Sequence, residues 1–274
     1  MSDRGLEVYE IGRIAVVPGS KPYLFYLTLD PASLTAVSVL EKITDEFAKE
    51  GIPILQVKTS TIGWGKPVKI IIIADFKDKE KLAEELAEKF KRTIFVKSVK
   101  LSQPITEGVV IDVFSFPLTF LGTRAVIFRE PVYKGFIIGG WKHFGVPYAI
   151  LLYSIGYEAG RLAYAEHAKV VNKPETIKFA EAVFQMIGFG RLEFIRLDDR
   201  AREAAIRIYD SFECQLFPGA GEIRGNFIRG IIAGWLAGYW NLGEDEEAFA
   251  REVKCIAKGD PYCEYIVYVE IKRR

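Results

Sequence analysis

Residues 22–101 alternate between strand-like and helix-like segments, and this alternation limits the folds that the chain can adopt. The apolar and aromatic stretch YLFYLTL (23–29) ends at Asp30-Pro31, which is typical of a strand followed by a helix start. The periodicity then predicts a helix at 33–51, a strand hairpin over 52–76 around a Gly-Trp-Gly turn, a helix at 78–92 and a strand at 93–101. The resulting strand–helix–strand–strand–helix–strand order is a split βαβ unit, with both helices on one face of an antiparallel sheet.

That order, together with the stretch TLDPASLTAVSVLEKITDEFAKEGIPILQVKTS, resembles an ACT-type regulatory domain over residues 22–101. The resemblance implies a site for an amino acid at the turn from the first strand to the first helix, where ACT domains often carry a glycine. Here the turn reads Asp30-Pro31-Ala32-Ser33, with no glycine. Two roles stay open for this half, an amino-acid site or a small sheet module for dimerisation. We expect a first domain at residues 1–103.

The second half, residues 104–274, follows the linker-like stretch SQPITEG at 102–108 and is also expected to be an α+β domain. Residues 146–169 form a long helix that is apolar on nearly every side, so most of it should be buried. We expect His167 to be solvated at the end of this helix, where its charge suits the helix dipole. The other predicted elements are a strand at 109–117, helices at 174–190 and 222–240, two strands within 191–217 and a hairpin at 248–272.

The closing hairpin contains two of the chain's three cysteines, in the stretch EVKCIAKGDPYCEY. Gly259, Asp260 and Pro261 are turn residues, so Cys255 and Cys263 should lie opposite or nearly opposite each other on the paired strands. Side chains in that relation have Cβ atoms ~5 Å apart, a separation that suits two thiolates on one zinc ion. Glu252 would face away from Cys255 on a regular strand, and it can join the site only where the chain kinks. The remaining cysteine, Cys214, can approach from a neighbouring strand.

Three interpretations of these thiols stay open. They are a zinc site, buried apolar fillers, since free cysteine is among the most buried residue types, and a cross-strand disulfide. A zinc site would use Cys214, Glu252, Cys255 and Cys263.

The stretches AILLYSIGYEAGR, DSFEC, IRGIIAGWLAGYW and EVKCIAKGDPYCEYIVYV together resemble the 4-vinyl reductase domain, over about residues 109–272. The resemblance implies an α+β fold related to nitric-oxide-sensing haem domains and to TRAPP vesicle-tethering subunits. Aromatic-sensing activators that carry this domain bind zinc through three cysteines and a glutamate. Glu252, Cys255 and Cys263 stand at three of these positions, whereas the other cysteine of the sensors falls where this chain has residues 226–229. Cys214 is the thiol that would replace it.

From this resemblance we expect a sensor or regulatory protein that binds a small apolar or aromatic molecule between the helices at 146–169 and 222–240. Aromatic side chains are predicted to line the site: Trp141, Tyr148, Tyr153, Tyr157, Trp235 and Tyr239. A vinyl-reducing enzyme is the rival class, because the family takes its name from that reaction, yet no nicotinamide or flavin fingerprint is evident and no catalytic residue is assigned. A dimeric assembly or tethering module without ligand is the third class. Both resemblances imply paired domains, so we expect a homodimer, with the glycine-rich helix allowing close contact.

Composition and charge restrict the partners and the cell compartment that we expect for this chain. A net charge of +1 over 274 residues and the absence of a basic stripe argue against direct nucleic-acid binding. The apolar windows are shorter than the ~20 residues of a membrane span, and the first ten residues do not resemble a signal peptide, so we expect a cytoplasmic protein. Asn and Gln are scarce while Glu, Lys, Ile and Val are plentiful, a bias that resembles proteins of hot environments.

Overall fold

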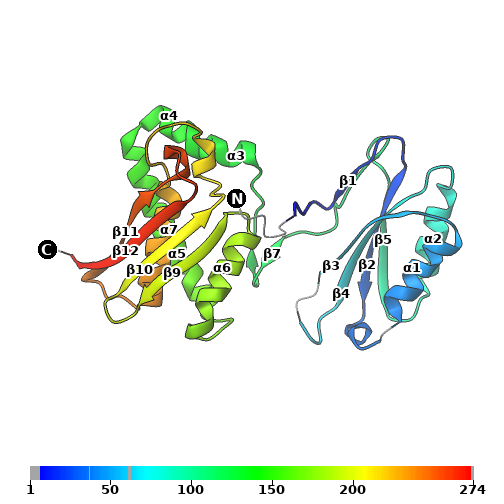
Figure 1. Cartoon of the computed structure of the whole chain (residues 1–274). Helices are drawn as coiled ribbons and strands as arrows, with labels where there is room; N and C mark the ends of the chain where they lie inside the picture. Colours follow the sequence, from blue (N-terminus) through cyan, green and yellow to red (C-terminus); the bar gives the residue numbers. More distant parts are fainter. Residues whose placement is uncertain (1–6, 37, 61–62, 273–274) are drawn as a thin grey trace. The chain divides into compact units, whose positions relative to one another are not determined.

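The computed structural model describes residues 7–36, 38–60 and 63–272. Residues 1–6, part of the stretch on which a signal peptide was judged, and residues 61–62, at the tip of the predicted hairpin, lie outside the described residues. The chain is a mixed α+β protein that divides into two compact units, one ending at Thr119 and one starting at Phe120 (Figure 1). The sequence-based boundary, at 103/104, is earlier than this division.

The first unit contains the predicted split βαβ order. Its elements are β1 (Ile14–Val16), β2 (Pro22–Leu29), α1 (Val39–Lys49), β3 (Ile54–Ser60), β4 (Val68–Asp75), α2 (Lys81–Lys91), β5 (Val96–Ser102) and β6 (Val109–Ile111). The four long strands form an antiparallel sheet in the order β3-β4-β2-β5, with α1 and α2 on one face (Figure 1). In α1, the buried residues Val39, Ile43 and Phe47 recur at helical spacing and face the sheet.

The central strands of this sheet are buried on both faces. In β2, Phe25 and Leu27 pack under the helices, while Leu24 and Tyr26 point to the other face. That second face is covered by a two-stranded ribbon of β1 and β6, in which Val110 is fully buried. The strand predicted at 109–117 is therefore short, and its described partner is β1.

The second unit is built on a four-stranded antiparallel sheet in the order β11-β12-β10-β9. Its elements are β8 (Thr123–Arg124), α3 (Glu130–Lys134), η2 (Gly135–Gly139), α4 (Gly140–Phe144), α5 (Val146–His167), η3 (Lys173–Glu175), α6 (Thr176–Met186), β9 (Arg191–Asp198), β10 (Glu203–Tyr209), η4 (Cys214–Leu216), α7 (Asn226–Tyr239), β11 (Glu246–Lys254), η5 (Ile256–Lys258) and β12 (Cys263–Ile271). The short strand β8 pairs with β7 (Thr119–Phe120), where the chain divides. Helix α7 packs against this sheet, and α5 packs against α7 (Figure 1). None of the helices in the described ranges is both long and apolar enough to span a membrane.

Helices α5 and α7 meet along a glycine seam, which we define as Gly156 and Gly160 of α5 with Gly230 and Gly234 of α7. A Cβ atom added to any of the four would overlap a backbone oxygen of the facing helix, at distances such as 2.2 Å at Gly160 and 1.8 Å at Gly234. The two helix backbones are therefore in direct contact. We expected the glycines of α7 at an interface between two copies, but they contact α5 of the same chain.

Candidate functional site

Four side chains that the sequence singled out for zinc lie together in the second unit. Cys214 begins η4, Glu252 lies in β11, Cys255 follows β11 directly, and Cys263 is the first residue of β12. One ligand atom from each lies within 4.8 Å of all the others, and all four residues are buried. We call this group the thiol–carboxylate cluster.

Glu252 joins the cluster because β11 is irregular. The pairing of β11 with β12 shifts register between Glu252 and Lys254, so that Val253 is an extra, exposed residue. A β-bulge of this kind bends a strand and re-aims its side chains. The bulge supplies the kink that Glu252 needed, and both Glu252 and Cys255 point inward.

The hairpin tip holds the two cysteines in place. The last registered pair of the ladder is Lys254 with Glu264, so that Cys255 and Cys263 are the next residues along the two segments. The backbone N–H of Cys255 donates to Asp260 Oδ2 at 2.8 Å, and the N–H of Ile256 donates to Cys263 Sγ at 3.4 Å. Gly259 adopts a φ of 105°, the left-handed region that its lack of a Cβ permits.

The electrostatics of the cluster favour a bound cation. Hydrogen bonding among the thiols holds the pKa of Cys255 well below its usual range and raises the pKa of Cys214. The pKa of Cys263 is also raised, and burial followed by the Cys255 charge raises the pKa of Glu252 to about 9. Glu252 Oε2 is buried and has no hydrogen-bond partner among the described residues. These buried groups cannot all ionise together without a compensating cation, and a metal ion would both supply that charge and satisfy the free oxygen.

The geometry also fits zinc. The sulfur atoms of Cys214 and Cys255 lie 3.6 Å apart, and Cys214 Sγ lies 4.0 Å from Glu252 Oε1. Tetrahedral zinc with ~2.3 Å bonds to sulfur separates its ligands by about 3.8 Å. All three cysteines are free thiols, so the structure contains no disulfide among them. When bound, zinc would supply a structural cross-link between η4, β11 and β12, since four protein ligands leave no open position.

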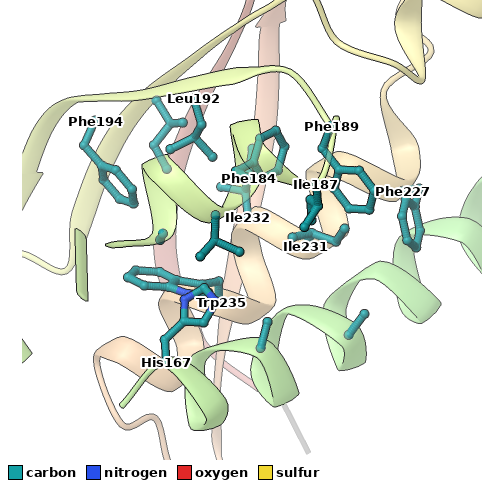
Figure 2. Close-up of a pocket in the computed structure, with 15 residues that line it drawn as sticks. His167, Phe184, Ile187, Phe189, Leu192, Phe194, Phe227, Ile231, Ile232 and Trp235 are labelled. Atoms are coloured by element: carbon teal, nitrogen blue, oxygen red, sulfur yellow. The ribbon is translucent and has the colours of Figure 1, made fainter. Parts of the chain in front are cut away.

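An apolar cavity of about 250 Å³ lies in the same unit, enclosed by α5, α6, α7 and the sheet (Figure 2). Its lining consists of Ala159, Ala163, His167, Ala180, Val183, Phe184, Ile187, Phe189, Leu192, Phe194, Ile206, Phe227, Ile231, Ile232 and Trp235. Among these fifteen residues, only His167 and Trp235 carry polar side-chain atoms. Because the glycine seam closes the space between α5 and α7, the cavity lies to one side of it, under α6.

His167 is a correction to the sequence analysis. Instead of being solvated, it is 6% exposed, and its Nδ1 accepts a hydrogen bond from Trp235 Nε1 at 3.2 Å (Figure 2). Its ring also packs edge-on against Phe179 of α6. Helix α6 covers the end of α5, which a reading of α5 alone does not show. Burial lowers the pKa of His167, and an imidazole that accepts at Nδ1 is neutral and carries its proton on Nε2.

The hydrogen-bonded pair of His167 and Trp235 should make the stability of the protein depend on pH. Because the pKa of His167 is lowered on folding, the unfolded chain takes up a proton first as the pH falls below about 6.5, and the folded state loses stability there. Protonation also removes the acceptor for Trp235. We expect His167→Phe to reduce the loss of stability between pH 7 and 5 in urea titrations. The exposed His143 is the matched control, and an equal change in His143→Phe would contradict the assignment.

The six aromatic residues predicted to line a ligand site are not brought together. Trp235 lines the cavity, and Tyr239 stacks on Trp235 at a ring distance of 5.6 Å while its hydroxyl donates to Asp199. The others lie elsewhere: Trp141 packs beside Phe217 and Arg224, Tyr148 donates to the Phe136 carbonyl, and Tyr153 and Tyr157 line a polar groove with Glu158, Arg161 and the loop before β11.

Sequence reasoning missed Glu213. This side chain is fully buried, and its carboxylate accepts from the backbone N–H groups of Phe227 and Ile228 at 2.9 and 2.8 Å. It therefore caps the first turn of α7 from a distant part of the chain. An acidic residue directly before Cys214, in the stretch DSFEC, was the available signal.

Comparison with known proteins gives the following similarities. No protein-family model matches the chain. The chain is 30% identical over 122 residues to the uncharacterized protein MJ0150 of Methanocaldococcus jannaschii, a match that covers 44% of this chain and 65% of that protein. The chain thus spans less than two thirds of the length of this curated relative.

Among solved structures, the chain is similar to the phenol-responsive sensory domain of the transcription activator PoxR, at 15% identity and a TM-score of 0.47, covering 53% of this chain and 77% of that one. It is also similar to a vinyl-4-reductase family protein from Methanocaldococcus jannaschii, at 23% identity and a TM-score of 0.32, covering 43% and 68%. A trafficking protein particle complex subunit 3 from Naegleria fowleri follows at 17% identity and a TM-score of 0.39, covering 53% and 95%. None of these three reaches a TM-score of 0.5.

Proposed function

We propose that the second unit is a small-molecule sensor or regulatory module that binds a small, largely apolar or aromatic ligand. The observation that carries this proposal is the 250 Å³ cavity, whose lining is apolar apart from one hydrogen-bonded pair, His167 and Trp235. In another protein, an apolar cavity of ~150 Å³ stays dry and binds benzene. The larger space here suits a molecule of similar chemistry with room for one polar group, to which neutral His167 would offer its Nε2 proton.

Mass spectrometry of small molecules released from freshly purified full-length protein tests this proposal. An apolar or aromatic compound released in proportion to protein supports sensing. Stoichiometric flavin or nicotinamide would contradict it and favour a reductase.

Filling the cavity should abolish binding. Ala180 is buried on α6 and lines the cavity, so the ring of Ala180→Phe would occupy the space that a ligand needs. With toluene as the probe at a hundredfold excess over its dissociation constant, wild-type protein should gain about 2.7 kcal/mol of stability. The A180F variant should gain almost none in a thermal melt. Ala182→Phe, on the exposed side of the same helix, should respond like wild type. Equal responses of A180F and wild type would place the ligand elsewhere.

We further propose that the thiol–carboxylate cluster holds a structural zinc ion through Cys214, Glu252, Cys255 and Cys263. The burial of all four residues, their common distance limit of 4.8 Å and the unsatisfied Glu252 oxygen support this assignment. The same hairpin carries the resemblance of the second unit to 4-vinyl reductase domains, the family that we propose for it.

For the first unit we propose an ACT-like module that serves dimerisation or regulation. Its sheet order supports the likeness. At the turn between β2 and α1, the Asp30 carboxylate already accepts from the Ala32 N–H at 2.9 Å and pairs with Lys97 at 3.0 Å. These contacts occupy groups that an amino-acid ligand would use, which argues against an amino-acid site at this turn.

We propose that two copies of the chain pair through the outer face of α5. This face exposes Ile150, Leu151, Ile155 and Leu162, with Glu158 and Arg161 on the same side of the helix. Large apolar residues gathered on one exposed helix face mark an interaction surface. In an antiparallel pairing of identical helices, the opposite charges of Glu158 and Arg161 complement those of the second copy, which favours a homodimer over an unrelated partner.

Charge reversal in the apolar part of this face should separate the copies. We expect wild-type protein to be a dimer at micromolar concentration by light scattering, and Ile155→Glu to be a folded monomer, because two buried carboxylates would face each other. Ile195→Glu, at a comparably exposed apolar position in β9 of the same unit, is the control and should stay dimeric. A monomeric wild-type protein would contradict the proposal.

A further inference from the structure

The first turn of α7 lies directly on the thiol–carboxylate cluster. The backbone of Arg224 lies close enough to the Cys255 thiol to help lower its pKa. A Cβ added to Gly225 would lie 2.9 Å from Glu252 Oε2 and 2.6 Å from the hydroxyl of Tyr265, so only glycine allows this approach. The start of the helix is therefore in contact with the proposed ligands from β11 and from the hairpin tip.

Glu213 connects the same turn to the remaining proposed ligand. Its two carboxylate oxygens accept from Phe227 and Ile228, while its own peptide bond leads to Cys214. A displacement of Cys214 consequently moves the group that caps α7. Glu213 is 0% exposed, so water is not at hand to replace the lost hydrogen bonds.

The same helix forms one wall of the cavity. Phe227, whose N–H is capped by Glu213, lines the cavity with its ring, and Ile231, Ile232 and Trp235 continue this wall along α7 (Figure 2). The thiol–carboxylate cluster is thus connected to the Glu213 cap, and the cap is connected through the first turn of α7 to the cavity wall.

We propose that Glu213 is a positioning residue that couples metal occupancy of the cluster to ligand affinity in the cavity. A metal ion that fixes Cys214 also fixes the Glu213 carboxylate, and with it the first turn of α7 and the ring of Phe227. The cavity then binds its ligand more tightly when the cluster is loaded, and loss of the metal weakens the sensor. By thermodynamic linkage, the cavity ligand must tighten metal binding by the same factor. This inference rests on the proposed cavity and metal site.

The test uses the full chain loaded with cobalt, which reports its thiolate ligands by a charge-transfer absorption band, and toluene as the cavity probe. In wild-type protein we expect toluene to shift this band and to bind about tenfold more weakly after metal removal, a typical coupling. Glu213→Gln keeps all four metal ligands. It should bind cobalt, yet show no toluene-induced band shift and less than about a twofold effect of metal on toluene binding.

Glu181→Gln is the matched control. The Glu181 carboxylate accepts from the N–H of Phe194 at 2.8 Å, and Phe194 also lines the cavity, while neither residue belongs to the cluster. E181Q should change toluene affinity equally in the loaded and metal-free states and keep the band shift. A band shift in E213Q equal to that of wild type would overturn the proposal.

Hydrogen exchange separates failure of this inference from failure of the proposed function. If toluene does not bind the loaded wild-type protein, the proposed ligand cavity is wrong. The exchange rates of the Phe227 and Ile228 amides still test the coupling between the metal and the first turn of α7. We expect these amides to exchange faster on metal removal in wild type, and to exchange fast in E213Q with or without metal. Protection that is independent of metal in wild type would refute the coupling.

Discussion

Cys263→Ser is expected to abolish metal binding and to destabilise the second unit by more than about 4 kcal/mol. Cys263 is fully buried at the start of the central strand β12, where it pairs with Ile208 of β10. A serine there removes a thiolate ligand from the cluster and leaves a hydroxyl among sulfur atoms. Elemental analysis should fall from about one zinc per chain to almost none, as expected of a four-ligand structural site.

The destabilisation by Cys263→Ser should result from the loss of the metal. Wild type and C263S should therefore differ much less in urea denaturation when a chelator is present. Ala257→Ser is the matched control, because Ala257 is fully buried in the same hairpin tip without belonging to the cluster. It should retain the metal. A metal-free wild-type protein with an unchanged melting temperature would show that the cysteines are buried fillers.

Gly234→Ala is expected to destabilise the protein by about 3 kcal/mol or more, although alanine is the better helix former. The added Cβ would lie 1.8 Å from the carbonyl oxygen of Tyr157 and 2.6 Å from its carbonyl carbon. Both are backbone atoms of α5, which cannot rotate away. The helices must separate, and separation exposes apolar surface along the whole glycine seam. Equilibrium urea unfolding measures this loss.

Gly139→Ala provides the comparison. Gly139 is helical, and no atom of the part of the chain that the structure describes lies within 4 Å of a Cβ built on it. Its substitution should be neutral or should stabilise the protein by up to about 1 kcal/mol. A similar loss of stability in G139A and G234A would mean that the seam is not closely packed in solution.

The element order of the first unit could be predicted from sequence because each element carries its own period. Phe47 and Ile43 mark a helix, and the apolar run of β4 marks a strand buried on both faces. The approach of Cys255 and Cys263 was also foreseeable, since the hairpin tip Gly259-Asp260 determines which residues face each other, whereas Cys214 was suggested by the family resemblance.

What sequence could not give depends on contacts between elements. The bulge after Glu252 arises from pairing with β12, and nothing in the local sequence specifies it. The glycines of α7 indicated a close contact, but not whether the partner is α5 or a second copy. Because the partner of α7 was not known, the sequence analysis placed the ligand between α5 and α7, where the two backbones are in contact. The burial of His167 under α6 has the same cause, because a helix end looks solvated until its neighbour is known.

The ribbon of β1 and β6 has a practical consequence for work on the separate halves. Ala15 and Val110 shield Leu24, Tyr26, Ile71 and Ile73 on the side of the sheet away from the helices. A fragment cut at residue 103 loses β6 and leaves β1 without its partner, so this apolar face meets water and becomes prone to aggregation. Expression of the first unit by itself therefore calls for an end point beyond Phe114, whose ring also packs on Tyr26.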